Sequence, residues 1–275
     1  MTTLSTTPSA APSVPGSVPG SVPQRRVPAY GGFNTTVLRI ELRRLLRNRR
    51  TLVFALVLPV ALFFSFSSAS GYDDSVGHGN VAAYVMVSMA LYGAALTASA
   101  AGASVGGERA LGWSRQLRLT PLKPVAYVGT KALVAVVMGA VAVTVVNVAG
   151  ALQGHAEMSV ARWVACGLLT VGCTMVFAAL GVFVGYLVPG ENAMQVLGPG
   201  LALLSFLGNV FIPIQDHSSL LWHIAQLTPM FGVAEVSRAP LTGELPWYAV
   251  VNVVAWLTLF VAGAAWRMSK DTARV

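Results

Sequence analysis

The chain has 275 residues and a mass of 28.7 kDa, and 55% of its residues are hydrophobic while only 10% are charged. A soluble domain carries about 25% charged residues, so this composition excludes an ordinary soluble protein and indicates a surface that faces lipid. The 18 basic and 10 acidic residues leave a net charge of +8. Cys166 and Cys173 lie seven residues apart in one apolar stretch. That spacing is about 10.5 Å along a helix, which excludes a disulfide between them.

Residues 1–33 are rich in proline, glycine and serine and have no periodic apolar face, which predicts a disordered tail. A helix is expected next, from about residue 34 to residue 50. Its leucines fall on one side, and the opposite side carries Arg39, Arg43, Arg44, Arg47 and Arg50. This pattern predicts an amphipathic helix in the membrane interface, with leucines among acyl chains and arginines on anionic headgroups. The alternative is a solvated basic flank of the first membrane span.

Six apolar stretches are long enough to cross the roughly 30 Å hydrocarbon core as helices, and none contains a charged residue. They are residues 51–69, 81–105, 132–152, 164–188, 193–211 and 248–266. Gly198, Pro199 and Gly200 interrupt the fifth stretch, which predicts a kink rather than the end of a span. We therefore expect an all-α polytopic membrane protein with six transmembrane helices and one transmembrane domain over residues 34–267.

Lysine and arginine are divided unevenly between the two sides of this expected membrane domain. With a cytoplasmic N terminus, 16 of the 18 fall inside, and only Arg162 and Arg238 fall outside. The positive-inside rule then places both tails, 1–33 and 268–275, in the cytoplasm. The membrane in which we expect the chain is the plasma membrane of the cell. Because topology accounts for the positive charge, the lipid bilayer is the expected partner and nucleic acid is not.

The sequence does not support an ATP-binding loop, a serine nucleophile or a metal site. Each of the three lysines is followed by a residue other than serine or threonine, so none belongs to a phosphate-binding loop for ATP. Residues 102–106 match G-x-S-x-G, but Ser104 has no histidine on its side of the membrane, and Lys131 is only a formal partner. Small residues over 98–107 favour close helix packing instead. The histidines and acids of the outer loops lack metal-site spacing, and we expect no metal.

Polar side chains are rare within the six stretches. An ion-coupled transporter places ionisable groups inside the membrane, and these stretches have none. An apolar interior suits a bulky apolar or amphiphilic molecule, with Ser65, Gln195 and Asn209 as polar candidates along its pathway. Residues 214–245, between the last two stretches, form a connection too long to be structureless. We expect a re-entrant helical segment there, on the outer side, which roofs the exit.

The longest connection on the cytoplasmic side, residues 106–131, is a charged amphipathic segment suited to docking a partner. Its distinctive residues are Glu108, Arg109, Gly112, Leu117, Thr120, Pro121 and Lys131. This run resembles the signature of type-2 ABC exporter permeases, above all their actinobacterial daunorubicin-resistance-like branch. Residues 211–213 and 227–229, followed by Gly232, Glu235 and Arg238, are similar to an outer segment of the same family. Trp113 departs from the pattern, since many members have threonine there.

The resemblance implies a transport subunit that binds no cofactor itself. It implies that two permease copies, either a homodimer as expected here or a heterodimer, work with two separate ATPase subunits, which use ATP and magnesium. It also implies outward transport of a drug, an antibiotic or a lipid-like molecule. The residues that it assigns to coupling with the ATPase are Glu108, Arg109, Gly112, Trp113, Thr120 and Pro121. In the alternative, Glu108 and Arg109 pair with each other or face water. For the whole chain, the alternative is a non-transport membrane protein such as an immunity factor, receptor or scaffold.

Overall fold

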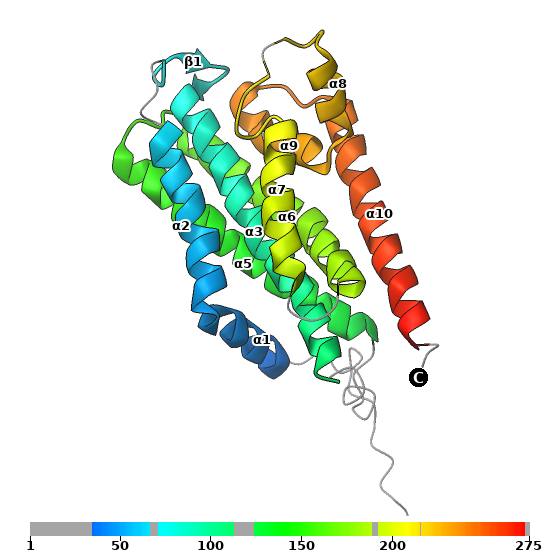
Figure 1. Cartoon of the computed structure of the whole chain (residues 1–275). Coiled ribbons are helices and arrows are strands. Elements are labelled where there is room, and N and C mark those ends of the chain that lie inside the picture. Colours follow the sequence, from blue (N-terminus) through cyan, green and yellow to red (C-terminus); the bar gives the residue numbers. More distant parts are fainter. Residues whose placement is uncertain (1–34, 67–70, 113–123, 189–191, 215, 273–275) are drawn as a thin grey trace, which may run out of the picture.

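The chain folds almost entirely into helices in the computed structural model, which describes residues 35–66, 71–112, 124–188, 192–214 and 216–272 (Figure 1). The helices are α1 (Thr35–Arg47), α2 (Arg49–Phe66), α3 (Val81–Ala110), α5 (Pro124–Gln153), α6 (Val160–Leu187), α7 (Ala193–Leu207), α8 (Leu220–Leu227), α9 (Pro229–Thr242) and α10 (Trp247–Thr272). Two short strands, β1 (Ser75–Val76) and β2 (Gly79–Asn80), pair antiparallel before α3. The expected disordered tail, residues 1–33, lies outside the described residues.

Four of the described helices, α3, α5, α6 and α10, are long and apolar enough to cross a membrane. α1 and α2 meet at 63° and make a fifth candidate if they count as one bent span. α7 is apolar but has 15 residues, about 22 Å of helix, which is shorter than the hydrocarbon core. The nearly all-helical fold is confirmed with four to five candidate spans, and the count of six stays a prediction.

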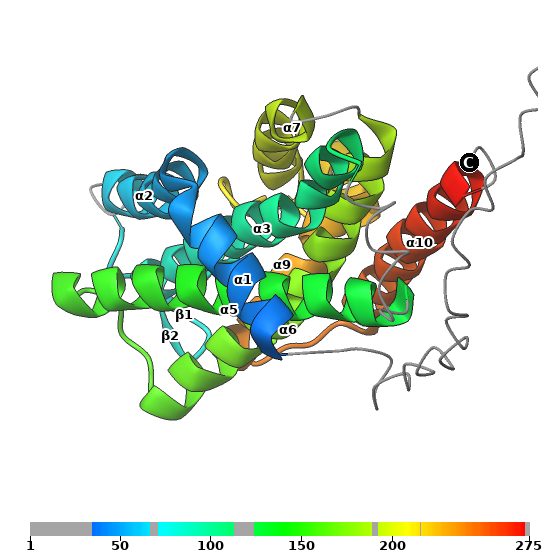
Figure 2. The same cartoon turned by 90° about the horizontal axis from the view of Figure 1, so that it is seen from below.

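α3 lies at the centre of the bundle and packs against α2, α5 and α6 (Figure 2). Small residues let α6 approach it closely. A Cβ added to Gly181 of α6 would lie 2.9 Å from the Cα of Ser99, and one added to Gly102 would lie 2.8 Å from a backbone nitrogen of α6. The Ser99 hydroxyl also donates to a backbone carbonyl of α6 at 3.1 Å. The expected close packing of residues 98–107 is confirmed.

Several predicted boundaries are wrong. α3 continues to Ala110 and α5 begins at Pro124, so the connection between them is shorter than the predicted 106–131. Proline is favoured in the first turn of a helix, where its missing N–H would have no intrahelical partner, and Pro124 therefore starts a helix. α10 continues to Thr272, past the predicted end of the last stretch at residue 266. By contrast, the prediction that Gly198, Pro199 and Gly200 do not end the fifth stretch is confirmed, because α7 continues through Pro199.

Two short helices, α8 and α9, fill the connection between α7 and α10, as the sequence predicted for residues 214–245. α9 packs against α3, α6, α7 and α10 and is largely buried. α8 instead exposes its apolar stripe, with Leu220 76% exposed and Leu227 73% exposed. Its Trp222 turns inward and packs edge-on against Phe231 of α9. The two helices lie at the end of the bundle that also carries β1 and β2 (Figure 1).

α10 is joined to the C-terminal end of α8 by side-chain hydrogen bonds. Asn252 donates to the carbonyls of Gln226, at 2.7 Å, and Thr228, at 3.1 Å. About one turn later, the indole of Trp256 donates to the carbonyl of Leu227 at 3.0 Å. The last carbonyls of a helix have no intrahelical partner, so α10 supplies the donors that α8 lacks.

Candidate functional site

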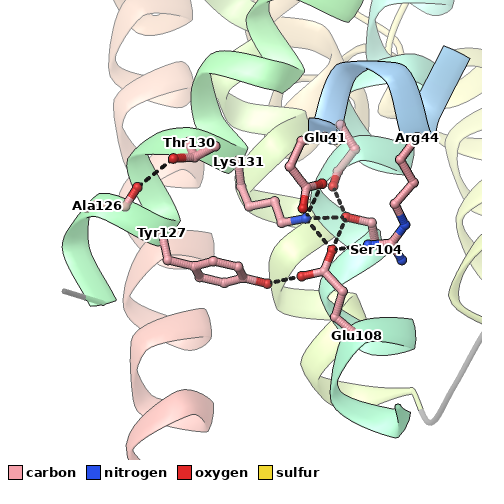
Figure 3. A network of polar contacts seen from close by, with 9 residues as sticks. Glu41, Arg44, Ser104, Glu108, Ala126, Tyr127, Thr130 and Lys131 are labelled. Carbon is pink, nitrogen blue, oxygen red and sulfur yellow. Dashed lines mark hydrogen bonds and ion pairs between the residues drawn. The ribbon is translucent and has the colours of Figure 1, made fainter. Parts of the chain in front are cut away.

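Six polar side chains from α1, α3 and α5 meet in one network (Figure 3). We call this network the charged cluster, and its members are Glu41, Arg44, Ser104, Glu108, Tyr127 and Lys131. Each helix contributes two residues three or four positions apart, a spacing that places both on the same helix face. The charged cluster thus arises from three such pairs brought together by helix packing.

Lys131 is the centre of the charged cluster and is only 2% exposed. Its ammonium nitrogen lies 2.8 Å from a Glu41 oxygen and 3.0 Å from Ser104 Oγ, and it also contacts Glu108. An ammonium has three hydrogens and no acceptor, so these partners use its full hydrogen-bonding capacity. Lys131 cannot take a proton from Ser104 in this arrangement, which removes the formal serine–lysine pair of the G-x-S-x-G match.

Glu108 connects the three helices and is 3% exposed. One carboxylate oxygen accepts from Arg44, at 2.7 Å, and from Lys131, while the other accepts the hydroxyl of Tyr127. With Glu41, the charged cluster holds two carboxylates and two cations, so its formal charges cancel. Buried charges are tolerated when they are paired and hydrogen-bonded, and the loss of one member leaves the others uncompensated.

The predicted position of Glu108 on a loop is wrong. It lies inside the last turns of α3, and its carboxylate is enclosed by residues of its own chain. The helix continues there because α3 packs against α5 and the Glu108 carboxylate is paired with Arg44 of α1 and Lys131 of α5. In this conformation Glu108 is unavailable for direct contact with another subunit.

The other predicted coupling residues lie at or beyond the end of α3. The Arg109 guanidinium donates to the carbonyl of Tyr186 in α6 at 3.3 Å and lies 4.9 Å from the centre of its ring. Gly112 has a φ of 70°, a left-handed conformation that glycine adopts at no steric cost. The remaining three, Trp113, Thr120 and Pro121, lie outside the described residues.

The arginines of the predicted interfacial helix fall into three environments. Arg39, Arg43 and Arg47 are exposed on α1, as an interfacial helix requires. Arg44 was expected on the same exposed side, but its guanidinium pairs with Glu108, although the side chain is still 46% exposed. Arg50 lies in α2 rather than in α1. α1 is thus amphipathic, and one of its arginines belongs to the charged cluster.

Glu41 and Tyr127 were missed by the reasoning from sequence. Glu41 is the only acidic residue before Asp73, and it lies among six arginines within residues 39–50. Anionic headgroups repel a carboxylate, so a single glutamate in such a basic interfacial helix indicates a specific cationic partner elsewhere in the protein. Tyr127 gave no comparable signal, because a tyrosine near the end of a span is ordinary.

The three polar pathway candidates differ in exposure. Ser65 on α2 and Gln195 on α7 are exposed. Asn209, just after α7, is buried and has a left-handed φ of 61°. Its side chain accepts from the backbone N–H of Ile214 at 2.8 Å and donates to Glu235 at 3.3 Å. Asn209 therefore holds the end of α7 against α9 and does not line an open surface.

Arg238 of α9, expected among the outer charges, is 1% exposed. It donates to the carbonyls of Asn209, at 2.8 Å, and Ala234, at 3.1 Å. Its guanidinium also lies 3.7 Å from Glu235 and 4.3 Å from the ring centre of Tyr84, near the start of α3. A second buried charge thus fastens α9 to the opposite end of α3 from the charged cluster.

The histidines and acids of the connections make pairwise contacts, among them His155 Nδ1 with Asp73 at 3.5 Å. Among the residues that the structure describes, no three His, Cys, Asp or Glu side chains lie together as metal ligands would. His217 packs on Trp222, with ring centres 4.1 Å apart. The hydroxyl and the backbone N–H of Ser218 donate to Asp216 and lower the pKa of that carboxyl.

Residues 34–242 match the family described as ABC-2 type transporter. That range extends from α1 through α9 and includes the whole charged cluster. A protein of Bacillus subtilis (strain 168) named "Putative transport permease YvfS" is 23% identical over 222 residues, which make up 80% of this chain and 91% of that protein. The family match covers most of the chain and agrees with its apolar helices, so the chain belongs to the ABC-2 type transporter family and is a multi-pass membrane transport permease.

Proposed function

We propose that the chain is the membrane-spanning subunit of an ATP-driven ABC exporter in the plasma membrane. The observation that carries the proposal is the family match, together with a segment that resembles the ATPase-docking signature of type-2 exporters. A separate ATPase subunit supplies the energy with ATP and magnesium, since no lysine of this chain belongs to a phosphate-binding loop. The substrate is an apolar or amphiphilic drug, antibiotic or lipid-like molecule, as in the daunorubicin-resistance-like branch.

Both termini are assigned to the cytoplasm. The assignment follows from the 16 of 18 basic residues that fall on one side of the expected spans. α1, the end of α3 and the end of α10 all lie at the same end of the bundle (Figure 1). The charged cluster is then on the cytoplasmic side, and α8, α9 and Arg238 are on the outer side.

The charged cluster transmits movement of the docking segment, residues 112–121, to the spans. Glu108 lies four residues before Gly112 and is bound to α1 through Arg44 and to α5 through Lys131. Because buried ion pairs hold these helices together, a push on the docking segment moves α1, α3 and α5 as one unit. Glu108 is therefore a positioning residue, and direct contact with the ATPase is made by the docking segment.

A second copy of the chain completes the pathway. α2 and α7 stand on either side of α3 (Figures 1 and 2). Both expose apolar side chains, including Phe54 on α2 and Phe206 on α7, as well as the polar Ser65 and Gln195. In a homodimer these faces enclose a pathway with apolar walls and few polar groups, which suits an amphiphilic substrate.

Replacing Trp113 with alanine is expected to weaken binding of the ATPase about thirtyfold and to leave the amount of permease in the membrane unchanged. Truncation of an aromatic hot-spot residue costs about 2 kcal/mol or more, while the apolar spans that govern insertion are untouched. The measurement is retention of the co-expressed cognate ATPase on tagged permease, with efflux of daunorubicin as a second readout. Arg118→Ala in the same segment is the control and is expected to retain the ATPase.

Two results would count against this assignment. Normal ATPase retention by Trp113→Ala would remove the docking role of the segment. A wild-type permease that captures no ATPase at all would favour a receptor, immunity or scaffold role over transport.

Re-entry of α8 into the outer leaflet predicts an uneven pattern of thiol labelling from outside the cell. Leu220 and Leu227 are about equally exposed on the protein, so cysteines at both positions would react equally fast in water. If α8 dips into lipid, the cysteine at 227 reacts at least about tenfold more slowly with a membrane-impermeant maleimide than the one at 220. Cys166 and Cys173 are buried free thiols, which keeps the background low. Equal rapid labelling at 220 and 227 would refute the re-entrant arrangement.

A further inference from the structure

Two glycines flank Pro199 in the middle of α7, and tertiary packing requires neither of them. A Cβ added to Gly198 or to Gly200 would meet no atom within 4 Å outside its own stretch of helix. Neither glycine has a positive φ, which is the usual conformational reason for glycine. Gly181 and Gly102, by contrast, lie against the backbone of the facing helix. Glycine on either side of Pro199 therefore weakens α7 without improving its packing.

Pro199 weakens the same part of α7. Its side chain is exposed, so it contributes no packing to the core. Proline has no N–H, so the carbonyl of Gln195 cannot receive the usual hydrogen bond from four residues later, and the proline ring crowds that carbonyl. Gly198 relieves part of the crowding, because a proline disfavours the helical conformation of a preceding residue that has a Cβ. We call residues 198–200 the weak turn, although α7 is continuous through it.

The weak turn separates two parts of α7 that pack against different groups of side chains. Before it, Ala193 and Leu197 pack with Ala103, near the C-terminal end of α3, in a small apolar cluster. The other side chains of residues 193–197 are partly or fully exposed. After the weak turn, Leu201 belongs to the main hydrophobic core of the protein. The first part of α7 is thus lightly held, and its contact with α3 is made by small side chains.

The second part of α7 is fastened to α9. A Cβ added to Gly208 would lie 3.0 Å from the backbone nitrogen of Phe231, so the end of α7 lies directly against α9. One residue later, the carbonyl of Asn209 accepts from the buried Arg238 at 2.8 Å. If the two parts of α7 move relative to each other, the pivot is therefore the weak turn.

α3 can act as the lever for such a movement. Its start is fastened to α9, since the Arg238 guanidinium lies 4.3 Å from the ring centre of Tyr84. Its opposite end carries Glu108 and leads to the docking segment. Ala103 lies about 28 Å along the helix from Tyr84, so a tilt about the fastened start displaces Ala103 far more than Tyr84. The side chains packed on Ala103 belong to the first part of α7.

We propose that the weak turn is a hinge that bends during the transport cycle. Residues 193–197 follow the C-terminal end of α3, while the part of α7 after the hinge stays with α9. The proposal rests on the proposed transport function and adds to it the place where the pathway wall formed by α7 changes shape.

The first test is amide hydrogen exchange of the purified full-length permease, which needs neither the ATPase nor a substrate. The double variant Pro199→Ala and Gly200→Ala restores a regular helical turn. It is expected to slow exchange of the amides at 200–203 about tenfold and to raise the unfolding midpoint by about 2–4 °C. Gly172→Ala, at an equally open position of α6, is the control and should leave exchange at 200–203 unchanged. Equal exchange at 200–203 in wild type and double variant would overturn the hinge.

The second test is efflux of daunorubicin with the co-expressed cognate ATPase. The double variant is expected to lower the maximal efflux rate about tenfold and to leave KM and retention of the ATPase unchanged, because it removes a movement and no contact. Pro199→Gly keeps the turn flexible and is expected to retain at least about half of the wild-type rate. Gly172→Ala should transport normally. Normal efflux by the stiffened double variant would overturn the proposal.

Failure of the proposed function and failure of the hinge have different signatures. The first appears in the wild type itself, as absence of ATP-dependent efflux, and the exchange rates then decide alone whether the hinge exists. The second appears as the lack of a difference between wild type and double variant. Loss of ATPase retention in the double variant would make α7 part of the docking surface and would count against the hinge.

Discussion

Replacing Glu108 with alanine is expected to lower the free energy of unfolding of the permease by about 3–5 kcal/mol. The substitution removes a carboxylate that accepts from Arg44, Tyr127 and Lys131. Lys131 is 2% exposed, and in the variant its buried ammonium keeps only one of its two carboxylate partners, Glu41. The effect is measured as the fall in the unfolding midpoint of permease purified in detergent, and it should be accompanied by lower abundance in the membrane.

The control for Glu108→Ala is Arg43→Ala, which truncates an exposed arginine of the same α1 helix and should change stability little. Lys131→Met alone should also be destabilising, since it leaves two buried carboxylates near each other. The double variant of Glu108 and Lys131 should cost less than the sum of the two single variants, by about 0.5–3 kcal/mol, because the two side chains are in contact. Strictly additive costs would contradict the buried pair.

Replacing Gly181 with leucine is expected to destabilise the fold by at least about 3 kcal/mol and to disrupt the packing of α3 against α6. A Cβ at this position would meet the backbone of Ser99 at 2.9 Å, closer than real Cβ atoms come to other atoms. Backbone atoms cannot rotate aside as a side chain can, so the two helices must separate. The separation is detectable as a lower unfolding midpoint and as faster amide hydrogen exchange in the middle of α3.

Gly172 provides the matched control in the same helix. A Cβ added there meets no atom within 4 Å, so Gly172→Leu should leave the α3–α6 contact intact. Loss of glycine flexibility within a helix should even stabilise it slightly, by up to about 1 kcal/mol. Equal destabilisation by the two leucine substitutions would show that hydrophobic bulk on α6, rather than the close backbone approach, causes the effect.

The helical fold could be predicted because lipid imposes strong requirements on a sequence. Long uncharged stretches are almost unavoidable in membrane helices, and they locate α3, α5, α6 and α10, although α5 begins eight residues earlier and α10 ends six residues later than predicted. Helix ends were predicted less well, because they depend on tertiary contacts. α3 extends past its apolar stretch because Glu108 finds partners on two other helices.

The charged cluster could be predicted only in part, for a related reason. The sequence motif included Glu108 and Lys131. The bend between α1 and α2, which places α1 against α5, has no periodic pattern in the sequence, so the contribution of α1 to the cluster could not be predicted. Arg44 looked like one more interfacial arginine, since its role depends on a partner 64 positions away. Asn209 likewise resembled an ordinary polar residue within a span in the sequence. Its hydrogen bonds to the backbone N–H of Ile214 and to Glu235 of α9 depend on tertiary packing that the sequence does not show.

The hydrogen bonds from α10 to the end of α8 have a consequence for biosynthesis. The ribosome delivers α8 before α10, so the carbonyls of Gln226 and Leu227 await donors that have not yet been translated. Unsatisfied carbonyls are costly in lipid, so the nascent α8–α9 hairpin stays at the wet interface or inside the insertion machinery until Asn252 and Trp256 emerge. Loss of these two side chains should therefore expose an incompletely assembled chain to the proteases that remove immature membrane proteins.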